Sequence, residues 1–136
     1  MTMPRVLVVD DTASIRFLIR TNLELAGHEV DEAVDGVDCL AILRDRGVMP
    51  DLITVDVMMP RLDGVATVTA ISADPLTRDI AVVMVSTQGQ TADIQRATEA
   101  GVDAYVTKPF DPDFLVRTVG EVIERTHDRR HGDTIS

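Results

Sequence analysis

Five polar residues stand at the ends of short apolar segments, where their side chains could do chemistry together. The segments are rich in Val, Ile and Leu, as expected for strands that are buried on both faces of a sheet. They end in Asp10 and Asp11, Asp56, Ser86 and Lys108, which offer three carboxylates, one hydroxyl and one ammonium group. If the segments end at one edge of a sheet, these groups form a single site.

Taken alone, each of these residues has an ordinary structural role. An Asp after a strand commonly caps a helix or forms a turn, and a Ser or a Lys-Pro pair in that place is normally part of a loop. The functional interpretation therefore depends on all five residues lying at one rim.

Converging carboxylates need compensation. Two carboxylates about 4 Å apart repel by ~4 kcal/mol at an effective dielectric constant near 20. Lys108 supplies one positive charge, and the rest must come from a bound cation, a shared proton or both. A ligand set made only of oxygen, without His or Cys, predicts a hard divalent ion, for which Mg²⁺ is the first choice.

The elements that would position these residues follow from the hydrophobic periodicity. Strands and helices are expected to alternate, which predicts an α/β fold: a doubly wound, five-stranded parallel sheet with five helices on its two faces. The strand order 2-1-3-4-5 suits this pattern and places a ligand site at the carboxyl ends of strands 1 and 3. The predicted strands are 5–9, 29–34, 52–55, 80–85 and 104–106, and the predicted helices are 14–26, 37–46, 64–73, 91–100 and 111–125.

Local signals support several of these boundaries. Asp63 is placed to cap the third helix, and Asp111 followed by Pro112 marks the start of the fifth. Gly47 should stop the second helix. After Thr126 no apolar periodicity remains, which predicts a domain over residues 1–126 and a flexible C-terminal tail over 127–136.

Composition limits the classes of function. The 136 residues carry 23 acidic and 13 basic side chains, a net charge of −10, and only 3% are aromatic. A surface of this charge argues against binding nucleic acid or membranes.

The sequence also bears on where the protein is located. The chain lacks a signal-peptide pattern and any apolar run long enough to span a bilayer. Its single cysteine, Cys39, fits a buried thiol in a reducing compartment. We expect a cytoplasmic protein of one domain.

Four stretches of the sequence carry a family resemblance. They are V-L-V-V-D-D at 6–11, D-L-I-T-V-D-V-M-M-P-R-L-D-G at 51–64, V-V-M-V-S-T at 82–87, and G-V-D-A-Y-V-T-K-P-F at 101–110. In this order they resemble the receiver domains of two-component response regulators, over residues 5–125. The set is highly specific, whereas D-x-x-x-P-x-x-x-G alone would be only suggestive. The resemblance implies the flavodoxin/CheY-like version of the predicted fold.

The resemblance also implies a phosphorylation site. Asp56 would be the phosphoacceptor. Asp10, Asp11 and Asp56, with the backbone carbonyl of Met58, would hold Mg²⁺. The chemistry is plausible in its own terms, because an ionised carboxylate can attack phosphorus without a general base.

Three further residues receive roles from the resemblance. Ser86 and Lys108 would contact the phosphoryl oxygens, and Lys108 would precede a cis peptide bond to Pro109. Ser86 and Tyr105 would form a switch that alters the face spanning residues 88–125, where a downstream target protein would bind.

The implied function is that of a single-domain response regulator. It would accept a phosphoryl group from a histidine kinase, a phosphotransfer protein or a small phosphodonor, and it would signal by protein–protein interaction in chemotaxis or a phosphorelay. It would catalyse only its own phosphorylation and dephosphorylation, and it would be a monomer or weak dimer.

Two other functions compete with this interpretation. A receiver fold that no longer accepts phosphate would be a pure interaction module, but it would be expected to lack Asp56, Lys108 or the acidic pair. A dehalogenase-like aspartyl phosphatase would require D-x-D after the first strand, whereas Asp10 and Asp11 are adjacent. It would also normally carry a cap domain.

Overall fold

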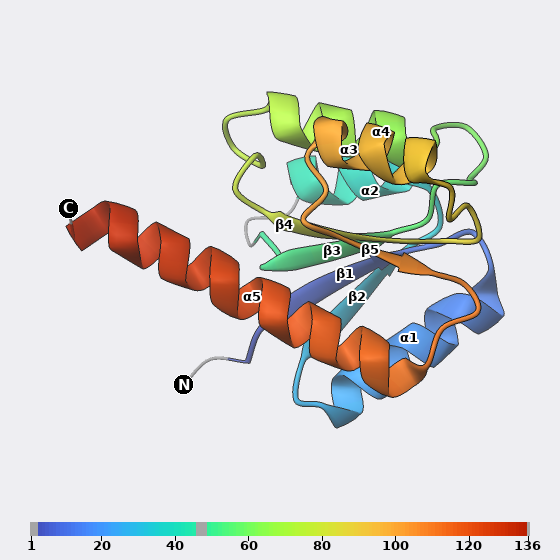
Figure 1. Ribbon diagram of the computed structural model, residues 1–136, viewed down its shortest axis with the longest axis horizontal. Coiled ribbons are helices and arrows are strands. Elements are labelled where there is room, and N and C mark those ends of the chain that lie inside the picture. Colours follow the sequence, from blue (N-terminus) through green and yellow to red (C-terminus); the bar gives the residue numbers. More distant parts are fainter. Residues whose placement is uncertain (1–2, 46–48, 136) are drawn as a thin grey trace.

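The computed structural model describes residues 3–45 and 49–135, in which five strands alternate with five helices (Figure 1). The strands are β1 (Arg5–Val9), β2 (Glu29–Ala33), β3 (Leu52–Val55), β4 (Ala81–Ser86) and β5 (Ala104–Thr107). The helices are α1 (Ala13–Leu25), α2 (Gly36–Asp45), α3 (Gly64–Ala73), α4 (Thr91–Ala100) and α5 (Pro112–Ile135).

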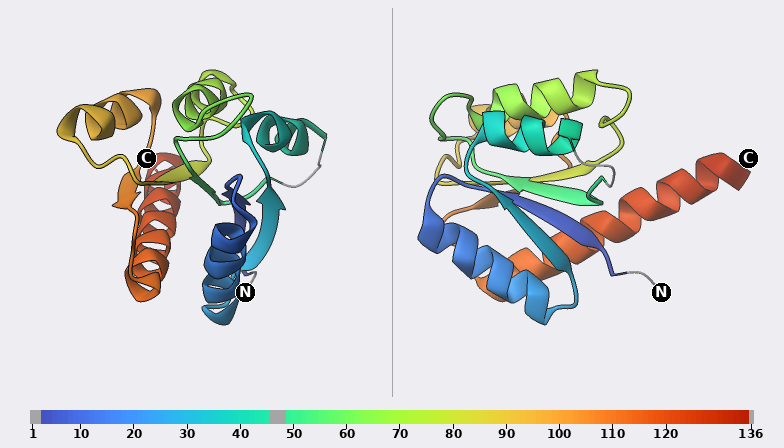
Figure 2. Two further views of the ribbon diagram at one scale, coloured as in Figure 1. Left: turned by 90° about the vertical axis from the view of Figure 1, so that its right-hand side faces the viewer. Right: turned by 180° about the vertical axis from the view of Figure 1, so that it is seen from behind.

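All strands run parallel in one sheet of order β2-β1-β3-β4-β5. Helices α1 and α5 cover one face, and α2, α3 and α4 cover the other (Figure 2). Val9 at the end of β1 pairs with Val55 at the end of β3, which in turn pairs with Met84 of β4. The carboxyl ends of these strands therefore meet at one rim, and the predicted fold class and strand order are confirmed.

The core lies in two layers, one on each face of the sheet. Alternate side chains of a strand point to opposite faces, so Leu7 packs under α2, α3 and α4 while Val6 and Val8 pack against α1 and α5. These side chains are almost wholly buried, and burying each one stabilises the fold by about 1.5–3 kcal/mol. Two apolar layers on a rigid sheet give the strand ends fixed positions.

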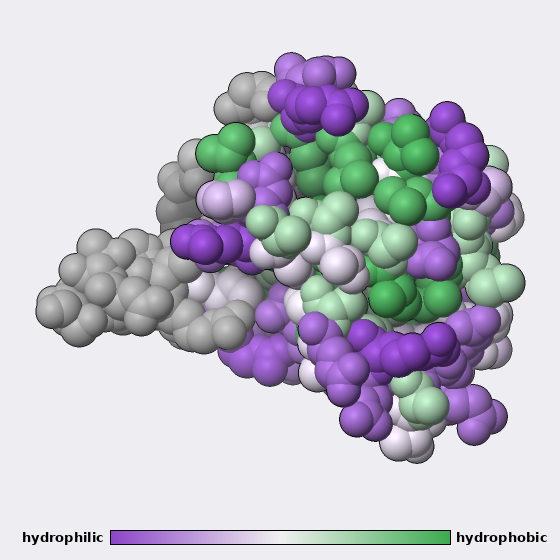
Figure 3. All heavy atoms as spheres, turned by 90° about the horizontal axis from the view of Figure 1, so that it is seen from above, coloured by the Kyte–Doolittle hydropathy of each residue, from purple (hydrophilic) through white to green (hydrophobic). Residues whose placement is uncertain are grey.

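The outer surface of the layer formed by α2, α3 and α4 is mixed. Figure 3 looks onto this face, where pale and green residues gather between purple, hydrophilic borders. Helix α3 contains no charged residue. Among the described residues, no helix combines the length and hydropathy needed to cross a bilayer.

Two helix starts match their sequence signals. The Asp63 carboxylate accepts a hydrogen bond from the backbone N–H of Ala66 at 2.8 Å, and the Asp111 carboxylate accepts one from the N–H of Asp113 at 2.9 Å. Both contacts satisfy donors that the first turn of a helix leaves free. Cys39 is buried in the core, as expected.

The structure differs from the sequence prediction at the last helix. The predicted helix ended at Arg125, whereas α5 continues to Ile135 and projects from the domain (Figure 1). Apolar periodicity marks only the part of a helix that packs against a core. The predicted end at Arg125 therefore marks the end of the packed part of α5, and not the end of the helix. The flexibility of residues 127–136 stays a prediction, and the predicted stop at Arg46 and Gly47 lies outside the described residues.

Candidate functional site

The site is built where β1 and β3 end. The backbone N–H of Asp10 donates to the carbonyl of Ala33, and that of Asp56 donates to the carbonyl of Val9, each at 3.2 Å. These bonds continue the ladder of the sheet by one residue beyond the strands. Asp10 and Asp56 are therefore held side by side as rigidly as the strands themselves.

Three carboxylates converge at this rim. Carboxylate oxygens of Asp10, Asp11 and Asp56 all lie within 4.8 Å of one another. Asp10 and Asp56 are buried, while Asp11 is exposed to solvent. The expected convergence of the acidic residues is present in the structure.

Lys108 reaches into the same cluster from the end of β5. Its Nζ lies 2.9 Å from Oδ2 of Asp10 and 3.2 Å from Oδ2 of Asp56. The backbone N–H of Lys108 donates to the carbonyl of Ser86 at 2.8 Å, which ties the loop after β5 to the end of β4. The Lys108–Pro109 peptide bond is cis, as the family resemblance implied.

Burial and the neighbouring charges together shift the pKa values of Asp56 and Lys108. Burial raises the pKa of the Asp56 carboxyl, and the Asp10 charge adds to this rise, whereas Lys108 lowers it only in part. Burial lowers the pKa of Lys108, but the hydrogen bonds and charges of Asp10 and Asp56 outweigh it, and the pKa is raised overall. Lys108 is therefore charged at neutral pH, and it compensates the carboxylates incompletely.

The donor set suits a divalent metal ion. Three carboxylates and one ammonium group leave a formal charge of −2 (−3 + 1) at the cluster. The cluster offers oxygen ligands and contains no imidazole or thiolate, a combination that Mg²⁺ prefers. Asp11 keeps its carboxylate open to solvent, so a metal that retains some of its waters fits here.

Ser86 and Tyr105 are linked through Gln88. Ser86 is fully buried at the end of β4, and its Oγ accepts a hydrogen bond from the N–H of Gln88 at 3.1 Å. The hydroxyl of the half-buried Tyr105 donates to the carbonyl of Gln88. The loop between β4 and α4 thus connects the hydroxyl at the rim with the aromatic ring on β5.

The loop after β3 packs closely on the site. Oδ1 of Asp56 accepts a hydrogen bond from the N–H of Met58 at 3.2 Å, so the side chain bends over its own loop. Gly64, at the start of α3, packs directly on this backbone. A Cβ atom at Gly64 would lie 2.2 Å from the carbonyl oxygen of Asp56, so the close approach requires glycine.

Sequence reasoning missed two arginines near the site. Nε of Arg61 lies 2.6 Å from a carboxylate oxygen of the buried Asp35 and joins the loops after β2 and β3. Nη1 of Arg16, on α1, donates to the carbonyl oxygen of Asp10 at 2.7 Å. Arg61 and Asp35 lie 26 residues apart in the chain, whereas Arg16 donates to a backbone carbonyl only six residues before it. The residue types alone signal neither contact.

A comparison with known families decides the relationship. The family model for the response regulator receiver domain matches residues 6–120. The chain belongs to this family. Receiver domains are signalling components of two-component systems. The matched family is the one that the four sequence motifs resemble.

Individual receiver proteins show the same relationship. The DNA-binding dual master transcriptional regulator RpaA of Synechocystis sp. is 39% identical over 124 residues, which cover 91% of this chain and 51% of that protein. The chemotaxis response regulator CheY4 of Vibrio cholerae has a TM-score of 0.83 at 33% identity, covering 89% of this chain and 99% of that one.

Part of a longer protein is also similar to this chain. NtrX from Brucella abortus has a TM-score of 0.89 at 30% identity, covering 99% of this chain and 30% of that one. The chain spans about half the length of the curated relatives that it matches first.

Proposed function

We propose that this receiver accepts a phosphoryl group on Asp56 in the presence of Mg²⁺. The observation that carries the proposal is the cluster of three carboxylates bridged by Lys108 at the carboxyl ends of the strands. Asp10, Asp11, Asp56 and the backbone carbonyl of Met58 would hold the ion. When bound, Mg²⁺ would neutralise charge on the phosphoryl oxygens.

The transfer requires little covalent chemistry from the protein. A carboxylate oxygen of Asp56 attacks phosphorus and forms a new O–P bond. The bond from phosphorus to the leaving group breaks, and its electron pair departs with the leaving group. In its ionised form Asp56 carries no proton to remove, so no general base would be needed. Lys108 and Ser86 would contact the phosphoryl oxygens and stabilise their charge.

The phosphodonor would be a histidine kinase, a phosphotransfer protein or a small acyl phosphate. Hydrolysis of the aspartyl phosphate would return the receiver to its resting form. Catalysis by the chain would be confined to its own phosphorylation and dephosphorylation.

The signal would leave through the face spanning residues 88–125. Phosphorylation adds charge and strong acceptor oxygens beside Ser86. A movement of Ser86 would carry Gln88 with it, because Gln88 contacts both Ser86 and Tyr105. Tyr105 would then change position on β5, and a target protein would bind the altered face more tightly.

Two forms of output are compatible with this switch. As a single domain over residues 1–126, the receiver would act by protein–protein interaction, in chemotaxis or a phosphorelay. Transcriptional regulation is the second candidate. It is favoured by RpaA, whose name describes a DNA-binding regulator and of which this chain matches about half.

Phosphorylation by acetyl phosphate tests the proposal. Intact mass after incubation with acetyl phosphate and Mg²⁺ should show one added phosphoryl group that is labile to base. Asp56→Asn should take up none, whereas Asp79→Asn, which removes an exposed acid far from the cluster in sequence, should behave as the parent. Equal uptake by Asp56→Asn and the parent would refute the assignment.

A further inference from the structure

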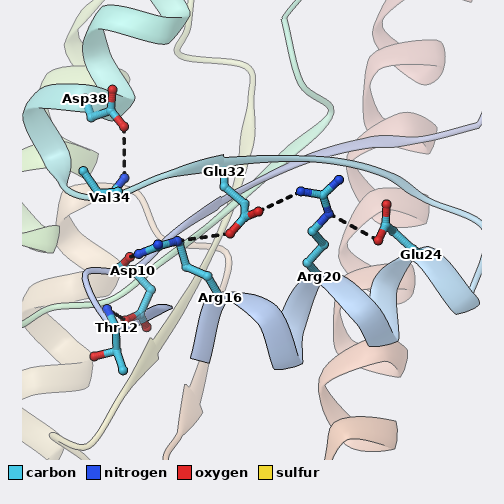
Figure 4. Close-up of polar contacts among 8 residues, drawn as sticks. All are labelled: Asp10, Thr12, Arg16, Arg20, Glu24, Glu32, Val34 and Asp38. Carbon is cyan, nitrogen blue, oxygen red and sulfur yellow. Dashed lines mark hydrogen bonds and ion pairs between the residues drawn. The ribbon is translucent and has the colours of Figure 1, made fainter. Parts of the chain in front are cut away.

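A chain of alternating charges joins α1 to β2 and ends at the acidic cluster (Figure 4). Glu24 pairs with Arg20 at 3.2 Å, Arg20 pairs with Glu32 at 2.7 Å, and Glu32 pairs with Arg16 at 3.1 Å. Arg16 is the last member, and its Nη1 donates to the carbonyl oxygen of Asp10 at 2.7 Å.

Arg16 completes the hydrogen bonding of Asp10. The N–H of Asp10 donates to Ala33, one carboxylate oxygen accepts from the N–H of Thr12 at 2.9 Å, and the other pairs with Lys108. The remaining polar group is the carbonyl, which belongs to the peptide joining Asp10 to Asp11. The orientation of this peptide sets the direction in which Asp11 leaves the strand.

The environment holds Arg16 in one position. Its side chain is 16% exposed, whereas that of Arg20 is 41% exposed. Hydrogen bonds from Arg20 and Arg16 lower the pKa of Glu32, the former having the larger effect. Glu32 therefore stays ionised and keeps the Arg16 guanidinium pointed at the Asp10 carbonyl.

We propose that Arg16 is a positioning residue for metal binding: it fixes the Asp10–Asp11 peptide so that both carboxylates face Asp56. The proposal rests on the proposed function, since it concerns the same metal site. It predicts a role for a residue that touches neither the metal nor the phosphoryl group. Groups that orient metal ligands commonly matter about as much as the ligands, and their loss weakens metal binding by roughly 10- to 100-fold.

The sign of the effect separates positioning from simple charge. Arg16 is a cation near an acidic metal site, so its charge alone opposes Mg²⁺ binding. On charge alone, Arg16→Ala should tighten Mg²⁺ binding. If Arg16 acts by positioning, the same change should weaken Mg²⁺ binding.

Arg20 offers a matched control. Arg20→Ala removes the same charge from the same helix and breaks contacts to Glu32 and Glu24. Among the described residues, no ion pair or side-chain hydrogen bond of Arg20 involves Asp10. Arg16→Lys supplies the second comparison, because a lysine keeps the charge but lacks the planar fork that serves two acceptors at once.

The test is a Mg²⁺ titration of the unphosphorylated full chain, followed by amide chemical shifts, which also report that each variant is folded. We expect Arg16→Ala to raise the Mg²⁺ dissociation constant by about 10-fold, Arg16→Lys to restore part of the loss, and Arg20→Ala to stay within about twofold of the parent because exposed charges are screened. Urea unfolding without Mg²⁺ shows how much each variant costs in stability.

Three outcomes would overturn the proposal. Unchanged or tighter binding by Arg16→Ala would mean that Arg16 does not position the ligands. An equal loss in Arg16→Ala and Arg20→Ala would assign the effect to the stability of the α1–β2 contact. A parent that shows no saturable Mg²⁺ binding would refute the proposed metal site itself, and the Arg16 proposal with it.

Discussion

The charge balance at Asp56 supports the proposed phosphorylation of this residue. Its carboxylate is buried beside Asp10, and Lys108 is shared between the two. A carboxyl group with a raised pKa is held in its ionised form at a cost. A metal ion or a phosphoryl group with its metal would relieve that cost, so the unmodified site is poised to bind one.

This balance predicts that Asp56→Asn stabilises the metal-free protein at neutral pH. The folded-state pKa of Asp56 is raised, so its contribution to stability is favourable below the unfolded pKa of about 3.9 and is lost as the pH rises through the folded pKa. At pH 7 the ionised group therefore destabilises the fold. We therefore expect Asp56→Asn to raise the free energy of unfolding of the metal-free protein.

Urea unfolding in EDTA at pH 7 measures this difference. Lys108 retains Asp10 as a partner in the variant, so the gain should not be offset by an unpaired ammonium group. The advantage of Asp56→Asn should shrink as the pH falls, because protonation of Asp56 removes its buried charge. A variant less stable than the parent at pH 7 would contradict the charge balance.

At the scale of elements, the site depends on how closely α3 approaches the loop after β3. Gly64 begins α3, and its N–H donates to the carbonyl of Val57 at 3.0 Å. The helix is capped by Asp63 from the same loop. The loop that carries Asp56 is thus fixed at both ends, by β3 and by α3.

Gly64→Ala should therefore disturb the fold at the site. A Cβ atom there would meet the Asp56 backbone at 2.2 Å, and overpacking of this kind costs about 1–3 kcal/mol. Gly120→Ala is the control, because nothing lies within 4 Å of a Cβ atom at that position in α5. It should stabilise the protein by about 0.5–1 kcal/mol through helix propensity.

Thermal or urea unfolding of the two variants tests this prediction. Opposite signs are expected for the same chemical change, which excludes a general effect of replacing glycine. If Gly64→Ala proved as stable as the parent, the loop after β3 would not be held against α3 as described.

For the whole molecule, the sequence predicted what local patterns encode. Buried strands of Val, Ile and Leu with a polar residue directly after them indicated both the sheet and the convergence of Asp10, Asp56 and Lys108. The sequence could not show the hydrogen bond from Arg16 to Asp10, because its acceptor is a backbone carbonyl. Nor could it show the pairing of Arg61 with Asp35, because these residues lie 26 positions apart. It also ended α5 too early, since periodicity reports burial and not helix length.

The central claim is that Asp56 carries the phosphoryl group, and locating the modification tests it most directly. After incubation with acetyl phosphate and Mg²⁺, borohydride reduces an aspartyl phosphate to homoserine, and tandem mass spectrometry of the peptides identifies the converted residue. The account predicts conversion at Asp56 in the parent and none in Asp56→Asn. Conversion at Asp10, Asp11 or another acidic residue of the parent, with Asp56 unchanged, would contradict it.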